Sequence, residues 1–236
     1  MTRHRFGMKR RSKVLIGVAA GVVVVGGVVA IAGPAFYRDV IVGEPEAAPT
    51  VSVTPGDSAL AGSDLTGSWS VGSGSTAGYR VDEVLNGTDV TVVGKTSDVT
   101  GTVDFDSDSI TKADITVDVA SIATDSTSRD EYFRTSALET DIHPDATFTL
   151  TSPLDTGDLS DGDVTKFTAT GKLTMHGVTK TVSVPMQAAL SGDGAEVSGS
   201  IPVTFADYKV AAPSLGFVKV EDSGSVEFLL KASPAA

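Results

Sequence analysis

The chain has 236 residues, of which 41% are hydrophobic, no cysteine and a formal net charge of -12 at pH 7. This length allows one or two domains with a hydrophobic core, and the absence of cysteine excludes disulfide bonds and cysteine-based zinc sites. The acidic charge repels phosphate backbones and therefore argues against nucleic-acid binding.

The N-terminal part begins with a basic tail and continues with an uncharged, apolar run. Residues 1–13 carry six of the eighteen Lys and Arg residues and no acidic residue, and residues 14–32 carry no charge. As a helix this run would span ~28 Å, close to the hydrocarbon thickness of a bilayer. Basic residues before such a span remain in the cytoplasm. The sequence therefore predicts a cytoplasmic tail over 1–13 and a transmembrane signal-anchor helix over 14–32.

The same run has an alternative interpretation as a cleaved signal peptide. Ala30-Ile31-Ala32 would then be the A-x-A cleavage site, although the apolar region exceeds the usual ~7–15 residues. The protein would be membrane-anchored in the first case and secreted in the second. In both cases the rest of the chain is expected on the extracytoplasmic side, at the cell surface or in a periplasm.

Residues 33–62 separate the apolar run from the remaining chain. They contain four prolines, several small residues and no sustained hydrophobic period, which is typical of a semi-extended linker. The sequence therefore predicts a linker rich in Pro, Gly and Ala over 33–62 and one folded domain over 63–236.

This domain has a nearly continuous strand pattern from Ser68 onward. Apolar and polar residues alternate in many short runs, which are joined by turn sequences such as "DSDS" and "SGDGAE". So many short strands at this spacing predict an all-β sandwich or barrel.

Residues 125–138 depart from the strand pattern. Ser128 and Glu131 have the spacing of a capping box, which satisfies free backbone amides at the start of a helix. Tyr132 and Phe133 are the bulky residues of this predicted short helix. The helix would either plug one end of a barrel or cover an open sheet edge.

Residues 171–186 form a predicted β-hairpin that turns at His176-Gly177. Leu173 and Met175 point to one face of the first strand, and apolar residues continue the alternation after the turn. The inward positions of the whole domain are mostly small or medium in size, which favours a cavity in an eight-stranded barrel. A packed sandwich of Val-rich strands would show the same composition.

The sequence contains no recognisable catalytic or metal-binding motif. It lacks the G-x-S-x-G elbow of serine hydrolases, and His143 and His176 lie in predicted loops or turns. Asp104, Asp106 and Asp108 lack the Gly and Glu that an EF-hand loop would require further along. We therefore predict a protein that is not an enzyme and needs no cofactor.

Two motifs, in residues 121–152 and 171–186, closely resemble the YceI-like family of polyisoprenoid- and lipid-binding proteins. The likeness extends over about residues 68–231. The matching positions are Ser121, Ile122, Arg129, Asp130, Pro144, Phe148, Leu173, Thr174, His176, Gly177, Val178 and Thr179. Where many members have paired phenylalanines after the helix, this chain has Ala137 and Leu138.

The resemblance implies an extended, antiparallel, eight-stranded lipocalin-like barrel with one short helical insertion. Its interior would hold an isoprenoid or another long apolar lipid, and His176 would be a structural turn residue. The candidate barrel-lining residues are Tyr79, Val81, Phe105, Ile115, Val117, Tyr132, Phe133, Phe148, Leu150, Leu173, Met175, Phe205 and Phe228.

Two functions remain open at this point. The protein is expected to be a membrane-anchored carrier or reservoir for a polyisoprenoid or related lipid on the extracytoplasmic side. Alternatively, it is a cell-surface interaction module whose barrel is solidly packed and holds no ligand. The oligomeric state is not predicted.

Overall fold

The computed structural model describes residues 45–52, 56, 60, 65–85, 87–106, 108–157, 159, 162–216 and 218–235. The predicted tail over 1–13, the predicted transmembrane helix over 14–32 and most of the predicted linker lie outside these residues. Within them, the structure has no helix that is long and apolar enough to cross a membrane.

The described part of the domain consists mainly of antiparallel strands. The strands are β1 (Gly67–Val71), β2 (Thr76–Leu85), β3 (Thr88–Thr96), β4 (Val99–Asp106), β5 (Ser109–Asp118), β6 (Asp145–Leu150), β7 (Leu154–Asp155), β8 (Thr165–Met175), β9 (Val178–Ser191), β10 (Gly194–Thr204), β11 (Ser214–Leu215) and β12 (Val218–Pro234). The helical elements are η3 (Val119–Ser121), α2 (Thr127–Tyr132), the π-helical turn η4 (Phe133–Ala137) and η5 (Phe205–Tyr208).

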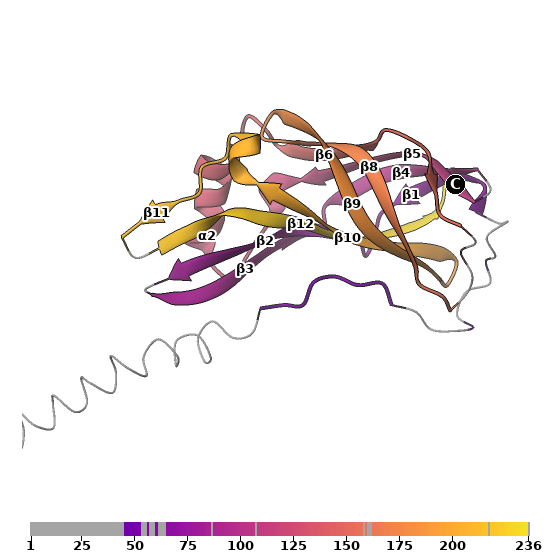
Figure 1. Ribbon diagram of the computed structural model, residues 1–236, viewed down its shortest axis with the longest axis horizontal. Helices are drawn as coiled ribbons and strands as arrows, with labels where there is room; N and C mark the ends of the chain where they lie inside the picture. The colour runs from indigo at the N-terminus through magenta and orange to yellow at the C-terminus, as the bar shows by residue number, and fades with distance from the viewer. Residues whose placement is uncertain are drawn as a thin grey trace, which may run out of the picture.

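Eight of the strands form a closed ring. Their order is β1-β4-β5-β6-β8-β9-β10-β12, and β12 pairs back with β1 (Figure 1). This ring confirms the predicted eight-stranded antiparallel barrel.

One edge of β12 pairs with two strands in succession. Residues 232–234 pair with β1, whereas residues 218–229 pair with β2. Since β2 pairs on its other side with β3, the β2–β3 hairpin extends the wall beyond the closed ring.

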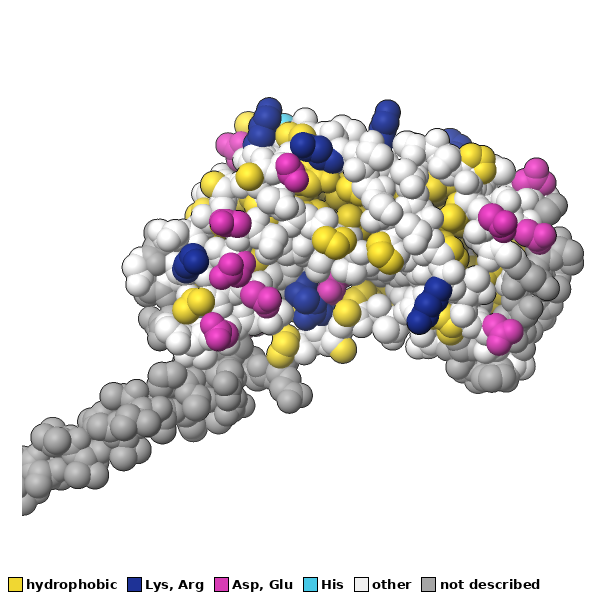
Figure 2. Space-filling model, in the orientation of Figure 1, with side chains coloured by type: hydrophobic (Ala, Val, Ile, Leu, Met, Phe, Trp, Pro, Cys, Tyr) yellow, Lys and Arg dark blue, Asp and Glu magenta, His cyan; other side chains and the backbone are white. Residues whose placement is uncertain are grey.

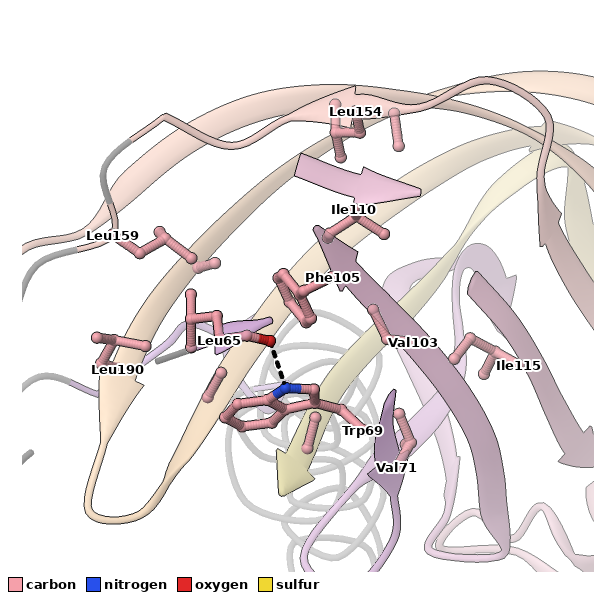
Figure 3. Close-up of a cluster of buried hydrophobic side chains, with 14 of the residues drawn as sticks. Leu65, Trp69, Val71, Val103, Phe105, Ile110, Ile115, Leu154, Leu159 and Leu190 are labelled. Atoms are coloured by element: carbon pink, nitrogen blue, oxygen red, sulfur yellow. Dashed lines mark hydrogen bonds between the residues drawn. The ribbon is translucent and has the colours of Figure 1, made fainter. Parts of the chain in front are cut away.

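The closed end of the barrel is packed around Trp69 on β1. Its side chain is 1% exposed, and its Nε1 donates a hydrogen bond to the carbonyl of Leu65 over 2.8 Å (Figure 3). Its ring meets that of Phe105 edge to face, with centroids 5.7 Å apart. Leu159 and Leu190 belong to the same buried cluster, so this end of the barrel is filled by side chains.

The opposite end is covered by residues 119–138, which we call the lid segment. It comprises η3, α2 and η4, and Val119, Ile122 and Leu138 form its buried cluster. A β-bridge between Lys95 and Ala123 attaches it to β3. This arrangement confirms the predicted short helix and places it over a barrel end.

The predicted capping box is wrong. The helix begins at Thr127, so Ser128 already lies inside it, and the N-cap residue Ser126 makes no side-chain capping bond. Instead the buried carboxylate of Asp130 accepts hydrogen bonds from the backbone N–H and the hydroxyl of Thr124, over 2.9 and 2.7 Å. The Asp130 side chain, which belongs to the helix, therefore stabilises the turn that precedes it.

A partly buried ion pair and an aromatic stack join the lid segment to β2. Arg129 contacts the carboxylate of Glu83, which is 6% exposed, over 3.3 Å. Tyr79 stacks on Phe133 with ring centroids 4.9 Å apart. Burial, with smaller effects from nearby charges, raises the pKa of Tyr79 to about 12.

Residues 45–52 of the predicted linker lie without regular structure along the outer side of the barrel (Figure 1). The backbone carbonyl of Glu46 accepts a hydrogen bond from Arg80 on β2, over 2.7 Å. The backbone N–H of Ser52 donates to the carboxylate of Glu196 on β10, over 3.1 Å. This part of the linker is thus attached to the domain.

Replacing Trp69 by Ala should lower the free energy of unfolding by about 3–5 kcal/mol, because it leaves a cavity at the point where β1 closes the ring. Urea denaturation followed by far-UV circular dichroism measures the effect. Tryptophan fluorescence would not serve, because Trp69 is the only tryptophan and the variant lacks it. The control Val164→Ala, at a side chain that is 43% exposed, should change the stability by less than about 0.5 kcal/mol. Similar unfolding curves for Trp69→Ala and the wild type would contradict this role.

The stability should also fall with rising pH above the ordinary tyrosine pKa of 10.0. Between this value and about 12, the unfolded chain loses the Tyr79 proton while the folded chain keeps it. The stability is therefore complete below pH 10.0 and decreases toward pH 12, by at most about 1.4 kcal/mol per pH unit from this group. Urea unfolding at several pH values gives the free energy of unfolding as a function of pH. Between pH 10 and 12 it should fall less steeply with pH for Tyr79→Phe than for the wild type. An equally steep fall would show that burial does not keep the Tyr79 hydroxyl protonated.

Candidate ligand-binding cavity

The barrel encloses a cavity between its closed end and its lid end. The cavity has a volume of about 120 Å³, and every residue that lines it except Thr147 is apolar. In contrast, the visible outer face carries acidic and basic side chains among uncharged ones (Figure 2). The interior therefore offers an environment for an apolar molecule and not for an ion.

Strand alternation places the lining side chains. In β8 the buried residues Ala169, Gly171 and Leu173 alternate with exposed Thr168, Thr170 and Lys172. Of the thirteen candidate residues, those that line the cavity are Phe105, Ile115, Val117, Phe148, Leu150, Leu173 and Phe228.

The other six candidates lie outside the cavity lining. Tyr79 and Phe133 stack on each other at the lid, and Tyr132 is 38% exposed on α2. Val81 packs with Val90 and Val92 on the β2–β3 hairpin, against Phe205. Met175 packs beside Leu173 and the lid segment.

These six residues lie outside the cavity lining for different physical reasons. Tyr79 and Val81 share the strand face of Ala77, which does line the cavity, but they lie on the part of β2 that extends beyond the ring. There the lid segment and η5 fill the space. Tyr132 is 38% exposed at the end of the six-residue helix α2.

Sequence reasoning missed two kinds of lining residue. The first kind carries the alternation signal but is less bulky than most of the thirteen candidates, and it includes Met186, Val197, Ile201, Val226 and Leu230. The second kind gives little hydrophobic signal: it consists of Ala77, Ala113, Ala146, Ala169, Ala195 and Ala232.

Two glycines keep the cavity open where the largest side chains enter it. Gly199 on β10 lies directly opposite Phe228 on β12, and a Cβ at Gly199 would come within 2.6 Å of the Phe228 ring. The ring of Phe148 likewise occupies the place of a Cβ at Gly171. Both phenyl rings therefore lie against bare backbone instead of projecting across the barrel.

The cavity ends toward the lid at a second packed cluster. Leu173, Val184 and Ile201 line the cavity and also pack with Val203 and Tyr208. Phe148, Met186 and Phe228 are only partly buried and pack against both this cluster and the one around Trp69. They form the boundary between the open and the filled parts of the barrel.

His176 holds the hairpin tip at this end. Its backbone has a positive φ of 50°, as a tight His-Gly turn requires. Its Nδ1 lies 3.0 Å from the carbonyl of Tyr208 and its Nε2 3.1 Å from the carboxylate of Glu139. These contacts agree with the predicted structural role. The described residues contain no group of His, Cys, Asp and Glu that could hold a metal ion.

Comparisons with known proteins give a consistent family relationship. Residues 69–232 match the family model of the YceI-like domain. The chain is 33% identical over 132 residues to a UPF0312 protein of Pectobacterium atrosepticum, covering 55% of this chain and 60% of that relative. It is 33% identical over 139 residues to protein YceI of Escherichia coli, covering 53% of this chain and 68% of that one.

Solved structures share the fold at lower identity. A polyisoprenoid binding domain from Saccharophagus degradans aligns with a TM-score of 0.58 and 18% identity, over 71% of this chain and 98% of that one. BcnA from Burkholderia cenocepacia aligns with a TM-score of 0.51 and 23% identity, over 66% and 96%. Because the family model spans residues 69–232, well over half of the chain, the chain belongs to the YceI-like family.

Proposed function

We propose that the protein binds an isoprenoid or another long apolar lipid inside its barrel, as a carrier or reservoir and not as an enzyme. The cavity carries this proposal, because it is enclosed by the strand ring and lined by apolar side chains with a single threonine. Membership of the YceI-like family and the shared fold of a polyisoprenoid binding domain support it.

Apolar burial would provide the driving force. Each Å² of apolar surface removed from water contributes roughly 25 cal/mol, and the lining offers no charge that an ionic ligand could pair with. An apolar cavity of about 150 Å³ holds one benzene-sized molecule. The cavity seen here therefore takes a short piece of an isoprenoid, and a longer chain requires Phe148, Met186 or Phe228 to move.

We also propose that the domain works on the extracytoplasmic side, anchored by residues 14–32. The uncharged run and the basic residues before it support this location. The attachment of residues 45–52 to the barrel would then keep the domain close to its anchor. If the apolar run is cleaved as a signal peptide, the same domain is secreted.

The lipid proposal is tested by organic extraction of the purified protein and mass spectrometry of the extract, which should contain an isoprenoid or another long-chain lipid. Val117→Asp should remove this lipid while the barrel still folds, because Val117 lines the cavity and is only half-buried, so that water can hydrate the carboxylate. Leu173→Asp should unfold the domain, because Leu173 is 3% exposed in the packed cluster and an unpaired buried charge costs several kcal/mol.

The matched control is Thr170→Asp on the outer face of β8, which should leave both the melting temperature and the lipid content unchanged. Lipid-free wild-type protein, together with unfolding of Val117→Asp, would favour the alternative of a solidly packed interaction module.

The location is tested separately. A reporter fused after Ala236 should be active only outside the cytoplasm, and the intact mass of the membrane-extracted protein should include residues 1–32. Activity in the cytoplasm would refute the location, and loss of residues 1–32 would replace the anchor by a cleaved signal peptide.

A further inference from the structure

The hydroxyl of Tyr208 has an unusual environment. The side chain belongs to η5, is 2% exposed and packs with Leu173, Val184 and Ile201. In the part of the chain that the structure describes, its Oη is the one buried side-chain polar atom without a hydrogen-bond partner. A phenylalanine would fill the same space without burying an unsatisfied hydroxyl.

The backbone around this residue is fixed by other contacts. The Tyr208 carbonyl faces Nδ1 of His176 on the β8–β9 turn, and the N–H of Val210 donates to the carbonyl of Phe205. Nearby polar groups of η5 and the hairpin tip thus have partners. The hydroxyl is the exception, which points to a partner outside the protein chain.

Tyr208 lies next to the cavity, separated from it by a boundary that can move. Its neighbours Leu173, Val184 and Ile201 are themselves cavity-lining residues. Phe148, Met186 and Phe228 lie between the free space and this cluster and are only partly buried. If these side chains rotate to admit a longer chain, the cavity extends toward Tyr208.

We propose that Tyr208 Oη donates a hydrogen bond to an uncharged oxygen of the bound lipid, such as a hydroxyl, carbonyl or ether oxygen. This inference rests on the proposed function and narrows its ligand class to isoprenoids that carry such an oxygen. It also orients the ligand, because the oxygen then lies at the lid end and the hydrocarbon chain extends toward Trp69.

The surroundings favour an uncharged oxygen over a phosphate. Apart from the hydroxyl, the Tyr208 cluster consists of apolar side chains, and an anion placed among them would lose its hydration. The ammonium of Lys180 is already paired with the carboxylate of Asp207 in the same turn, over 3.6 Å. Burial, with a further contribution from Asp207, raises the pKa of Tyr208, so the hydroxyl remains a donor at neutral pH.

The test compares three lipids with the same number of isoprene units: squalene, hexaprenol and hexaprenyl phosphate. Displacement of a fluorescent fatty acid from the lipid-free protein gives their dissociation constants for the wild type and for Tyr208→Phe. The substitution should weaken hexaprenol binding about fivefold to tenfold, the equivalent of one hydrogen bond, and leave squalene binding unchanged. The wild type should bind hexaprenol more tightly than hexaprenyl phosphate.

The melting temperature provides an independent readout. Tyr208→Phe should melt at the wild-type temperature or above it, because the variant buries one unsatisfied hydroxyl fewer. The control Tyr132→Phe removes an exposed hydroxyl and should bind all three lipids like the wild type.

The outcomes separate this inference from the proposed function. If the wild type binds neither the fluorescent fatty acid nor any of the three lipids, the proposed function fails, and the inference fails with it. If it binds the fatty acid but none of the three isoprenoid lipids, only the inference fails. If the wild type binds hexaprenol but Tyr208→Phe binds it equally well, or loses squalene to the same extent, only the hydrogen bond is refuted. A markedly lower melting temperature for Tyr208→Phe would also refute it, since the hydroxyl would then have a partner within the protein.

Discussion

The architecture depends on the division of one edge of β12 between two strands. Its last residues pair with β1, and the preceding part of the same edge pairs with β2. The ring of eight strands consequently closes at one end, while the β2–β3 hairpin extends the wall at the other. The closed end can be packed by side chains around Trp69, whereas the extended end needs the lid segment and η5 to cover it. The cavity is the space between these two differently filled ends.

Side-chain size and backbone shape together determine which parts of the barrel interior are packed and which stay free. Phe148 and Phe228 enter the middle of the barrel where a glycine faces each ring, as Gly199 faces Phe228. Toward the lid, Leu173 and Val184 still line the cavity, but they are almost completely buried and pack with Tyr208. A lipid carrier and a packed interaction module therefore do not require different architectures. In this fold a filled interior and an open interior occur along the same barrel axis.

The sequence predicts the parts of this structure that depend on local pattern. Alternation in runs such as residues 165–175 identifies strands and their inward faces, and the break in alternation locates the helix within residues 125–138. Strand order is not local, so the pattern could not show that Tyr79 and Val81 lie on an extension outside the ring. Alanines such as Ala169 carry too little hydrophobic signal to be chosen as lining residues. The burial of the Tyr208 hydroxyl likewise depends on contacts between β8, β9, β10 and η5, which are distant in the sequence.

The alanines that line the cavity determine how wide the cavity is. They lie on β5, β6, β8, β10 and β12 of the eight-stranded ring and on β2, which extends it. Each contributes a methyl group where a longer side chain would fit only by entering the cavity. The strand ring fixes the backbone diameter, and these methyl groups fix how much of that diameter is left free. Related barrels could thus be narrowed or shortened internally, one position at a time, without any change in strand number or pairing. Selectivity for ligand thickness and length is in this way separable from the stability of the fold.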